Sequence, residues 1–310
     1  MKILITGKNG QVGWELNRYL HNLAEVYAFD KLGLDLSQPD QILKIIREVK
    51  PDIIINAAAY TAVDLAESDK ENAELINANA PGILAEEAKR LGSVLIHYST
   101  DAVFDGEKRT PYLESDLTNP INVYGFTKLA GEKAIEQVGV PHMIFRTSWI
   151  FANRGNNFMR TILKLASQQN NISVVNDQIG APTSAEMVAK ATTMILKNSF
   201  LNAVNKSKLD FDAGIYNMTS HGQTSWYEFA VAIIDLAKKI GIQKGNDINS
   251  SYPNILPISS SEYPLVAKRG MYSVLDNQKL NNSFSISLLD WRIQLELCLN
   301  SGLFIPKFQL

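Results

Sequence analysis

Short apolar segments alternate with longer helical patterns through the first half of the chain, and this alternation constrains the fold more than any other feature. The apolar segments lie at residues 2–6, 26–29, 52–55, 94–99 and 142–146. Helical spacing of apolar residues recurs between them, at about residues 11–21, 40–49, 72–91 and 124–137. Right-handed crossovers join strands that alternate with helices, so the sheet is parallel and covered on both faces. The pattern therefore predicts an α/β fold built on a doubly wound parallel sheet.

The pattern changes after about residue 150. Further helical segments follow near residues 157–167, 184–197, 226–240 and 288–299. The intervening segments are rich in Asn, Ser and Pro, and we expect surface loops at residues 202–212 and 246–257. These features indicate a second, smaller α/β lobe.

The charge and composition of the chain exclude several classes of function. The net charge of −2 provides no overall basic field that would hold nucleic acid or an anionic membrane. No apolar stretch approaches the ~18 residues of a membrane span, and the first apolar run is too short for a signal peptide. The single cysteine, Cys298, fits a reducing compartment, so we expect a cytoplasmic protein. Structural or surface roles are expected for the histidines, whose spacing suggests neither a zinc site nor a catalytic triad: His21, His97, His142 and His221.

Gly7, Gly10 and Gly13 form a Gly-x-x-Gly-x-x-Gly turn between the first strand and the first helix. Glycine lets the backbone turn tightly and lets a pyrophosphate approach the free N–H groups at the helix N-terminus. A glycine triplet also serves as an ordinary strand–helix turn, and Asp30 at the end of the second strand is by itself equally consistent with a turn cap. Together they predict a Rossmann-type dinucleotide site in which Asp30 binds the adenosine ribose. The Asp30 carboxylate favours NADH because it repels a 2′-phosphate, but Lys31 beside it would tolerate NADPH, so both cofactors remain open.

A length of 310 residues is enough for two compact domains. We expect residues 1–150 to form the dinucleotide-binding domain, to which residues 184–218 return. Residues 151–183 and 219–310 are expected to form a smaller substrate-binding lobe that closes over the strand ends.

Tyr124 and Lys128 lie four residues apart at the start of a predicted helix, and therefore on one face of it. Tyrosine has an ordinary pKa of about 10, and a nearby ammonium would lower the pKa of Tyr124 toward neutrality. Thr100 ends the fourth strand at the carboxyl edge of the sheet, where ligands of open α/β sheets bind. Tyrosine–lysine pairs also occur by chance on solvated helix faces. The combination with Thr100 and the glycine turn nevertheless predicts an oxidoreductase in which Tyr124 gives a proton to a carbonyl that Thr100 orients.

Several longer strings extend these motifs along most of the chain. They are TGKNGQVGWEL at residues 6–16, NAAAYTAVDLAE at 56–67, STDAVFDG at 99–106, NVYGFTKLAGE at 122–132, RTSWIF at 146–151 and DQIGAPT at 177–183. In these strings the chain resembles the extended short-chain dehydrogenase/reductase family, and within it the reductases of dTDP-linked 4-keto sugars. The resemblance implies NAD(P)H-dependent reduction of the C4 ketone of dTDP-4-dehydro-L-rhamnose to dTDP-L-rhamnose, in dTDP-rhamnose biosynthesis.

The resemblance also implies roles for individual residues. The cofactor would contact, besides the glycines and Asp30, a set spread over three strand ends and one helix: Gln11, Val12, Asp35, Leu36, Ala59, Tyr60, Thr61, Tyr124 and Lys128. The dTDP-sugar would contact Thr100, Asp101 and Trp149, although Trp149 also suits a place in the core. Arg269 is either a clamp on the substrate pyrophosphate or a member of a surface ion pair.

The chain departs from the family pattern at two informative places. Ala102 stands where the family usually has an aromatic residue beside the catalytic threonine, which puts the fit of the substrate in doubt. Some members bind Mg²⁺ at a dimer interface through glutamates; Glu15 and Glu186 match two of these, but Arg292 stands at the third. A cation disfavours Mg²⁺, so we expect no metal site and lose that support for a homodimer, which stays open.

Two alternatives stay open, one from the Ala102 departure and one from the family resemblance. The chemistry stays the same but the substrate changes if Ala102 reshapes the pocket for another dTDP-4-keto-6-deoxy sugar. The second alternative is a nucleotide-binding regulatory subunit without turnover. The resemblance implies this role too, because the family also includes a regulatory subunit. Retention of Thr100, Tyr124 and Lys128 argues against it, because a pure binding protein needs no proton donor.

Overall fold

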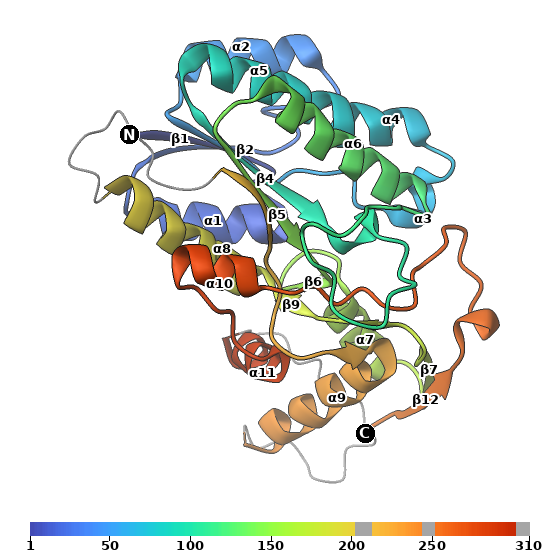
Figure 1. Cartoon of the computed structure of the whole chain (residues 1–310). Helices are drawn as coiled ribbons and strands as arrows, with labels where there is room; N and C mark the ends of the chain where they lie inside the picture. The colour runs from blue at the N-terminus through green and yellow to red at the C-terminus, as the bar shows by residue number, and fades with distance from the viewer. Residues whose placement is uncertain (202–212, 244–251, 302–310) are drawn as a thin grey trace.

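A parallel sheet of six strands forms the centre of the larger part of the molecule (Figure 1). The computed structural model describes residues 1–201, 213–243 and 252–301. The strand order is β10-β5-β4-β3-β1-β2, and every neighbouring pair is parallel. The strands are β1 (Lys2–Thr6), β2 (Glu25–Phe29), β3 (Ile53–Asn56), β4 (Val94–Thr100), β5 (His142–Thr147) and β10 (Gly214–Asn217). The order runs outward in two directions from β1 and β3, so the predicted doubly wound α/β fold is confirmed.

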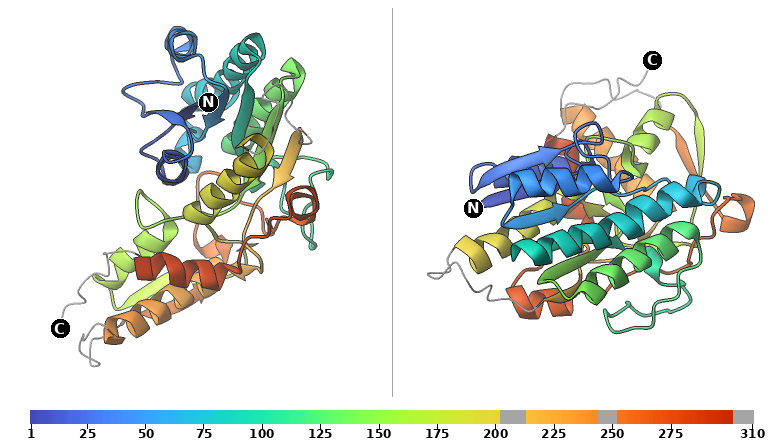
Figure 2. Two further views of the ribbon diagram at one scale, coloured as in Figure 1. Left: turned by 90° about the vertical axis from the view of Figure 1, so that its left-hand side faces the viewer. Right: turned by 90° about the horizontal axis from the view of Figure 1, so that it is seen from above.

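Helices cover both faces of this sheet, as Figures 1 and 2 show. Side chains alternate between the faces of a strand, so Ile3 and Ile5 pack in one core and Leu4 in the other. The Ile3 side is covered by α1 (Gln11–Leu20) and α8 (Ala185–Leu196), which pack against each other. The other side is covered by α2 (Pro39–Val49), α5 (Ala80–Leu91) and α6 (Val123–Val138). Because both faces are buried, the strands are apolar along nearly their whole length.

The helix predicted at residues 72–91 consists of three consecutive segments. These are α4 (Lys70–Glu74), the π-helical turn η1 (Leu75–Asn79) and α5. Buried Asn77 in the π-helical turn accepts a hydrogen bond from the Tyr60 N–H at 2.8 Å and donates to the Tyr60 carbonyl at 3.1 Å. It also donates to the Thr127 hydroxyl of α6 at 3.2 Å. Asn77 therefore ties the segment after β3, which contains the short helix α3 (Val63–Ala66), to α6.

A smaller lobe packs below the sheet, around its own core (Figure 1). The side chains of Met159, Phe229 and Trp291 are fully buried at its centre. Its helices are α7 (Phe158–Ala166), α9 (Trp226–Gln243) and α11 (Trp291–Ser301). Three two-stranded pairings complete it: β7 (Asn171–Val175) with β12 (Asn254–Ile258), β6 (Ile150–Phe151) with β9 (Thr183–Ser184), and β8 (Ile179–Gly180) with β11 (Thr224–Ser225). The remaining short elements are η2 (Asp101–Val103), η3 (Lys197–Leu201), η4 (Ser260–Glu262) and α10 (Gln278–Phe284).

One of the two predicted surface loops is partly wrong. Residues 254–258, within and just after the predicted loop 246–257, form β12 and pair in parallel with β7. The Asn and Pro content of the segment favoured a loop, but a strand with only one partner tolerates a proline that lacks an N–H. Residues 246–251 and the other predicted loop, 202–212, lie outside the described residues.

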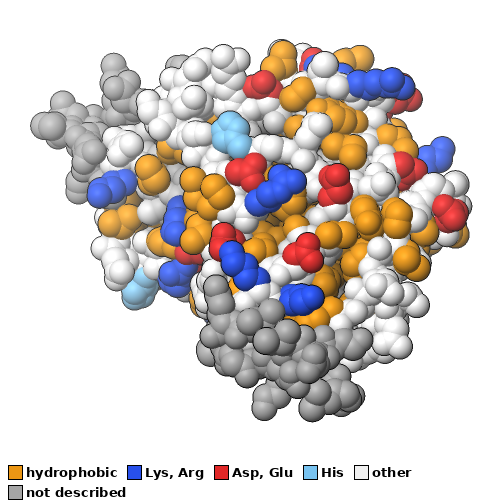
Figure 3. All heavy atoms as spheres, turned by 90° about the horizontal axis from the view of Figure 1, so that it is seen from below, with side chains coloured by type: hydrophobic (Ala, Val, Ile, Leu, Met, Phe, Trp, Pro, Cys, Tyr) orange, Lys and Arg blue, Asp and Glu red, His pale blue; other side chains and the backbone are white. Residues whose placement is uncertain are grey.

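The surface carries charges of both signs. On the face seen from below, acidic and basic side chains are interspersed among hydrophobic ones over the described part of the surface (Figure 3). Among the described helices, none is both long and apolar enough to cross a membrane.

A buried ion pair between α6 and β5 generates a stability prediction. Arg146 donates to Glu132 at 2.7 Å and 3.0 Å, and both side chains are at most 3% exposed. Glu132→Gln keeps the size of the side chain but leaves the Arg146 charge uncompensated, so we expect the free energy of unfolding to fall by about 3–5 kcal/mol. Urea denaturation measures this loss. The matched control is Glu296→Gln, which breaks a surface pair with Lys239 and should cost less than about 1 kcal/mol. Equal losses in the two variants would contradict the prediction.

Candidate active site

The glycine turn lines a cavity of about 510 Å³ at the carboxyl ends of the central strands. Gly7 has a positive φ of 71°, and a Cβ on Gly13 would lie 2.2 Å from the Gly7 carbonyl oxygen, so only glycine fits at either place. Helix α1 begins directly after Gly10, which has no side chain to cap it. The N–H groups of the first helical turn are therefore left for a ligand, and their partial positive charge suits a pyrophosphate.

Most of the residues predicted to bind the cofactor line this one cavity. They are Gly7, Gly10, Gln11, Val12, Asp30, Asp35, Leu36, Ala59, Thr61, Tyr124 and Lys128. Gly13 and Tyr60 are not among its lining residues. Gly13 instead permits the close approach of α1 to the turn, and the Tyr60 hydroxyl bonds to Asp69 at 2.9 Å. The glycine turn and the proposed proton donor thus face the same space.

Asp30, which lines this cavity, lies among hydrogen-bond donors. It accepts hydrogen bonds from the Gly33 N–H at 3.1 Å and from the Asn9 amide at 2.9 Å, and Lys8 lies 3.8 Å away. The Gly33 N–H and these neighbours hold the pKa of the Asp30 carboxyl below its usual range. Lys31 turns instead toward Asp35, at 3.9 Å. Asp30 is therefore a carboxylate at neutral pH, and Lys8 is the basic residue beside it.

Thr100 and Tyr124 are brought together by the turn that follows β4. The Thr100 hydroxyl donates to Asp101 at 2.9 Å and accepts from the Ala102 N–H at 3.1 Å. A Cβ on Gly125 would lie 2.1 Å from the Ala102 carbonyl oxygen, so the glycine after Tyr124 allows this turn to reach α6. Burial raises the pKa of the Tyr124 phenol to about 12, a hydrogen bond with Thr100 opposes the rise, and the Asp101 charge adds to it.

Asn122 fixes the start of α6, the helix that carries Tyr124. Its side chain accepts a hydrogen bond from the Gly125 N–H at 2.8 Å, which caps the helix. The same side chain donates to the Lys268 carbonyl at 2.9 Å, so the cap also fastens the segment after η4 to the helix. Tyr124 therefore projects from a helical turn held on two sides.

Lys128 is buried, and its side chain is directed at β4. Its ammonium donates to the Tyr98 carbonyl at 2.5 Å and lies 3.1 Å from His97 Nε2. Burial lowers the pKa of Lys128 to about 8, although the nearby Glu132 charge opposes the fall. The expected lowering of the Tyr124 pKa by Lys128 is not found, because burial, Thr100 and Asp101 set the phenol's pKa instead. Helical spacing placed the two residues on one face but did not determine where a long lysine side chain would turn.

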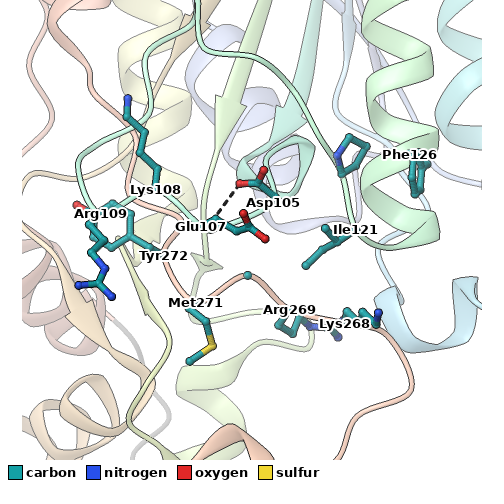
Figure 4. A pocket seen from close by; sticks show the side chains of 13 residues that line it. Asp105, Glu107, Lys108, Arg109, Ile121, Phe126, Lys268, Arg269, Met271 and Tyr272 are labelled. Atoms are coloured by element: carbon teal, nitrogen blue, oxygen red, sulfur yellow. Dashed lines mark hydrogen bonds between the residues drawn. The ribbon is translucent and has the colours of Figure 1, made fainter.

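Trp149 and Arg269 both have protein partners. The Trp149 indole stacks on Trp226 with centroids 3.5 Å apart, and it packs against Gly180, where a Cβ would come within 2.4 Å of the ring. The Arg269 guanidinium forms an ion pair with Asp64 at 2.9 Å. Arg269 also lines a second cavity of about 870 Å³, which shares no lining residue with the first. Figure 4 shows Arg269 beside Lys268 at the rim of this second cavity.

The glutamates that the family resemblance assigns to Mg²⁺ do not fit that ion here. Arg18 donates to Glu15 at 2.7 Å and to Glu186 at 3.1 Å, and Lys190 lies 3.1 Å from Glu186. Mg²⁺ requires oxygen ligands in octahedral geometry, whereas these oxygens already bind cationic side chains. Within the described ranges, no group of three or more His, Cys, Asp or Glu side chains is arranged to hold a metal ion.

The Tyr124 pKa can be measured directly. Because burial favours the neutral phenol, we expect Tyr124 to stay protonated through pH 10 and to titrate near 12. NMR of protein labelled with ¹³C at the tyrosine ring would follow this titration, with the resonance assigned by its loss in Tyr124→Phe. A midpoint at or below the ordinary value would contradict the burial argument.

Comparison with known proteins places this geometry in a family. A family model described as the RmlD substrate binding domain matches residues 1–303. A dTDP-4-dehydrorhamnose reductase of Burkholderia thailandensis is 45% identical over 298 residues, covering 96% of this chain and 98% of the relative. Two solved dTDP-4-dehydrorhamnose reductases superpose with a TM-score of 0.84 and cover 97% of this chain and 99% of their own: that of Clostridium acetobutylicum, 36% identical, and that of Bacillus anthracis in complex with NADP, 32% identical. The chain therefore belongs to the RmlD substrate binding domain family.

Proposed function

We propose that this protein reduces the C4 ketone of dTDP-4-dehydro-L-rhamnose to dTDP-L-rhamnose with NADPH or NADH. The observation that carries the proposal is the single cavity lined by the glycine turn, Tyr124 and Lys128. It provides a dinucleotide site and a proton donor facing the same space. The names of the relatives in Burkholderia thailandensis and Clostridium acetobutylicum agree with this reaction, and the NADP complex from Bacillus anthracis agrees with the cofactor.

The nicotinamide cofactor, when bound, supplies the hydride that adds to the carbonyl carbon. Gly10, Gln11 and Val12 would hold its pyrophosphate at the start of α1. Asp30 would accept hydrogen bonds from the adenosine ribose, and Asp35 and Leu36 would lie near the adenine. The lining of the 510 Å³ cavity by all six residues supports these roles.

Tyr124 would give its proton to the carbonyl oxygen as hydride arrives. A phenol with a pKa of about 12 keeps its proton at neutral pH, which a donor requires. Thr100 would orient the carbonyl oxygen, and its contacts with Asp101 and Ala102 hold its hydroxyl in place. Lys128 would hold the nicotinamide ribose from its place beside β4.

The dTDP-sugar would lie where the two lobes meet. We assign contacts with it to Thr100, Asp101, Trp149 and Arg269. Supporting observations are the half-buried Trp149 indole and the second cavity beside Arg269, although Arg269 must loosen its pair with Asp64 to clamp a pyrophosphate. The division into a cofactor domain (1–150 with 184–218) and a substrate lobe (151–183 with 219–310) stays part of this proposal. Homodimer formation and the cytoplasmic location also stay predictions.

Ala102 is the reason to consider an alternative substrate. Its N–H donates to the Thr100 hydroxyl, and a small side chain at this position would suit a differently shaped 4-keto-6-deoxy sugar. Proton NMR of the product separates the alternatives, because it reports the configuration at C4. A purely regulatory role predicts cofactor binding without turnover on any dTDP-sugar.

The first prediction of this proposal concerns Tyr124→Phe. Removal of the proton donor should lower kcat by about 10²–10⁴-fold while leaving NADPH affinity nearly unchanged. The assay follows NADPH absorbance with dTDP-4-keto sugar generated from dTDP-glucose by the preceding enzymes. Tyr19→Phe, which removes a hydroxyl bonded to Glu186 outside the cavity, is the matched control and should keep full activity. Equal rates in the wild type and both variants would contradict the assignment of Tyr124 as the proton donor.

The second prediction concerns Asp30→Asn and the choice of cofactor. Loss of the carboxylate removes a charged acceptor for the ribose hydroxyls and removes its repulsion of a 2′-phosphate. We expect the ratio of NADH to NADPH affinity to fall by about tenfold. Fluorescence titration with each cofactor measures the ratio, with Asp40→Asn in the first turn of α2 as the control. An unchanged ratio would show that Asp30 does not face the ribose.

A further inference from the structure

A row of buried polar side chains runs across the sheet to Lys128. Thr6, Asn56 and His97 stand side by side because the strand register pairs Thr6 with Asn56 and Asn56 with His97. The Thr6 hydroxyl lies 2.7 Å from Asn56 Oδ1, and Asn56 Nδ2 lies 3.1 Å from His97 Nδ1. His97 Nε2 lies 3.1 Å from the Lys128 ammonium nitrogen. All four side chains are at most 1% exposed, so their hydrogen bonds must be satisfied by the protein. Outside the row, Thr6 Oγ1 accepts from the Ala58 N–H at 3.2 Å and Lys128 donates to the Tyr98 carbonyl.

The protonation of Lys128 determines the direction of every hydrogen bond in this row. An ammonium group has three donors and no acceptor, so His97 Nε2 must be bare and Nδ1 must carry the ring proton. The Asn56 side chain must then offer its oxygen to Nδ1 and its NH₂ to Thr6 Oγ1. A neutral Lys128 amine instead accepts from a His97 Nε2–H, which leaves Nδ1 bare. The Asn56 NH₂ then donates to Nδ1, and the Thr6 hydroxyl donates to the Asn56 oxygen. The Asn56 orientation in the structure corresponds to this second arrangement. Turning the amide over produces the first, in which Thr6 Oγ1 accepts from Asn56 as well as from the Ala58 N–H and no longer donates to Asn56.

Among the groups around Lys128, His97 is the one that can change between donating and accepting a hydrogen bond. From α6 itself, Glu132 lies one turn after Lys128 and Tyr124 one turn before it. Arg146 of β5 pairs with Glu132 at 2.7 Å, and the Glu132 charge still opposes the lowering of the Lys128 pKa by burial. On β4 the Tyr98 carbonyl is a fixed acceptor. Burial and the Lys128 charge both hold the pKa of His97 well below its usual range, so the imidazole stays neutral beside the ammonium.

We propose that His97 is a positioning residue for Lys128, in which a bare Nε2 accepts from the ammonium and the tautomer reverses when Lys128 loses its proton. The proposal rests on the proposed function in one respect, that the reduction uses a charged Lys128. Without the His97 acceptor, the ammonium would keep the Tyr98 carbonyl but lose its second partner in this buried place. The charged form would then be less stable, and Lys128 would lose its proton at lower pH.

The tautomer of His97 can be observed without any substrate. Long-range ¹H–¹⁵N NMR of the whole chain labelled in histidine distinguishes a bare nitrogen from a protonated one. Only four histidines are present in the sequence, and His97 is assigned by its loss in His97→Gln. We expect the Nδ1–H tautomer near pH 6 and a change to Nε2–H around pH 8, where Lys128 titrates. Lys128→Met should abolish the change. An Nε2–H tautomer throughout, or an imidazolium at pH 6, would overturn the proposal.

A pair of variants tests the consequence for activity. His97→Gln keeps an amide oxygen near the position of Nε2, whereas His97→Asn replaces only the Nδ1 side of the ring. We expect the alkaline limb of the pH profile of kcat/KM to stay in place in His97→Gln and to move about one pH unit lower in His97→Asn. His142→Gln, at a second buried histidine on β5, is the control and should not move the limb. A structural role alone would lower the rate or stability of both variants without separating their profiles, and that result would also overturn the proposal.

The two proposals fail in distinguishable ways. If the protein does not reduce the dTDP-4-keto sugar, the proposed reaction is wrong, but the NMR titration still decides the role of His97. The pH dependence of NADPH affinity then replaces the kinetic profile, because Lys128 would hold the ribose. Turnover with an unchanging His97 tautomer would leave the reaction intact and remove the role of His97.

Discussion

The lateral register of β1, β3 and β4 is the constraint on which the rest of the site depends. Parallel pairing sets Thr6, Asn56 and His97 level with one another, so three chain segments leave the sheet at the same edge. The glycine turn follows the first, the Ala57–Thr61 segment the second, and Thr100 lies three residues beyond the third. A slip of one residue in any pair would send its side chains to the opposite face. One register therefore positions both the glycine turn and the buried row behind Lys128.

Helix α6 brings charged side chains into the buried layer against the sheet. Tyr124, Lys128 and Glu132 follow one another at intervals of four residues and share one face. A charge in such a place is costly unless it is paired, and each has a partner on the sheet. Glu132 binds Arg146, while Lys128 binds the Tyr98 carbonyl and His97. The same burial that lowers the pKa of Lys128 raises the pKa of Tyr124, so the geometry favours a proton donor over a phenolate.

The smaller lobe contributes by fastening segments that are distant in sequence. Residues after η4 reach back to the larger part of the molecule, where the Ala267 N–H and the Arg269 guanidinium bind Asp64 and the Lys268 carbonyl binds Asn122. At the other end of this segment, Asp177 accepts from the Ser260 N–H and hydroxyl. The chain between η4 and Arg269 is therefore tied to both lobes beside the two cavities. Arg269 serves this connection in the structure, and a role on substrate would have to replace it.

Local patterns in the sequence were sufficient for the architecture and for much of the site. Period and length distinguish buried strands from amphipathic helices, and the spacing of Gly7, Gly10 and Gly13 follows from backbone conformations that only glycine adopts easily. The i, i+4 spacing likewise placed Tyr124 and Lys128 on one face. Each of these properties depends on residues close together in the chain.

Only the folded chain decided the partners of those residues. Nothing near His97 in the sequence indicates that it will meet Asn56 and Lys128, which lie 41 and 31 residues away. Pairing of β12 with β7 and of Arg269 with Asp64 spans still longer separations. Such contacts, and the pKa shifts that burial causes, depend on strand register and on how helices pack over the sheet. These are properties of the whole fold, because a buried polar group takes whichever partner the packing brings within hydrogen-bond distance.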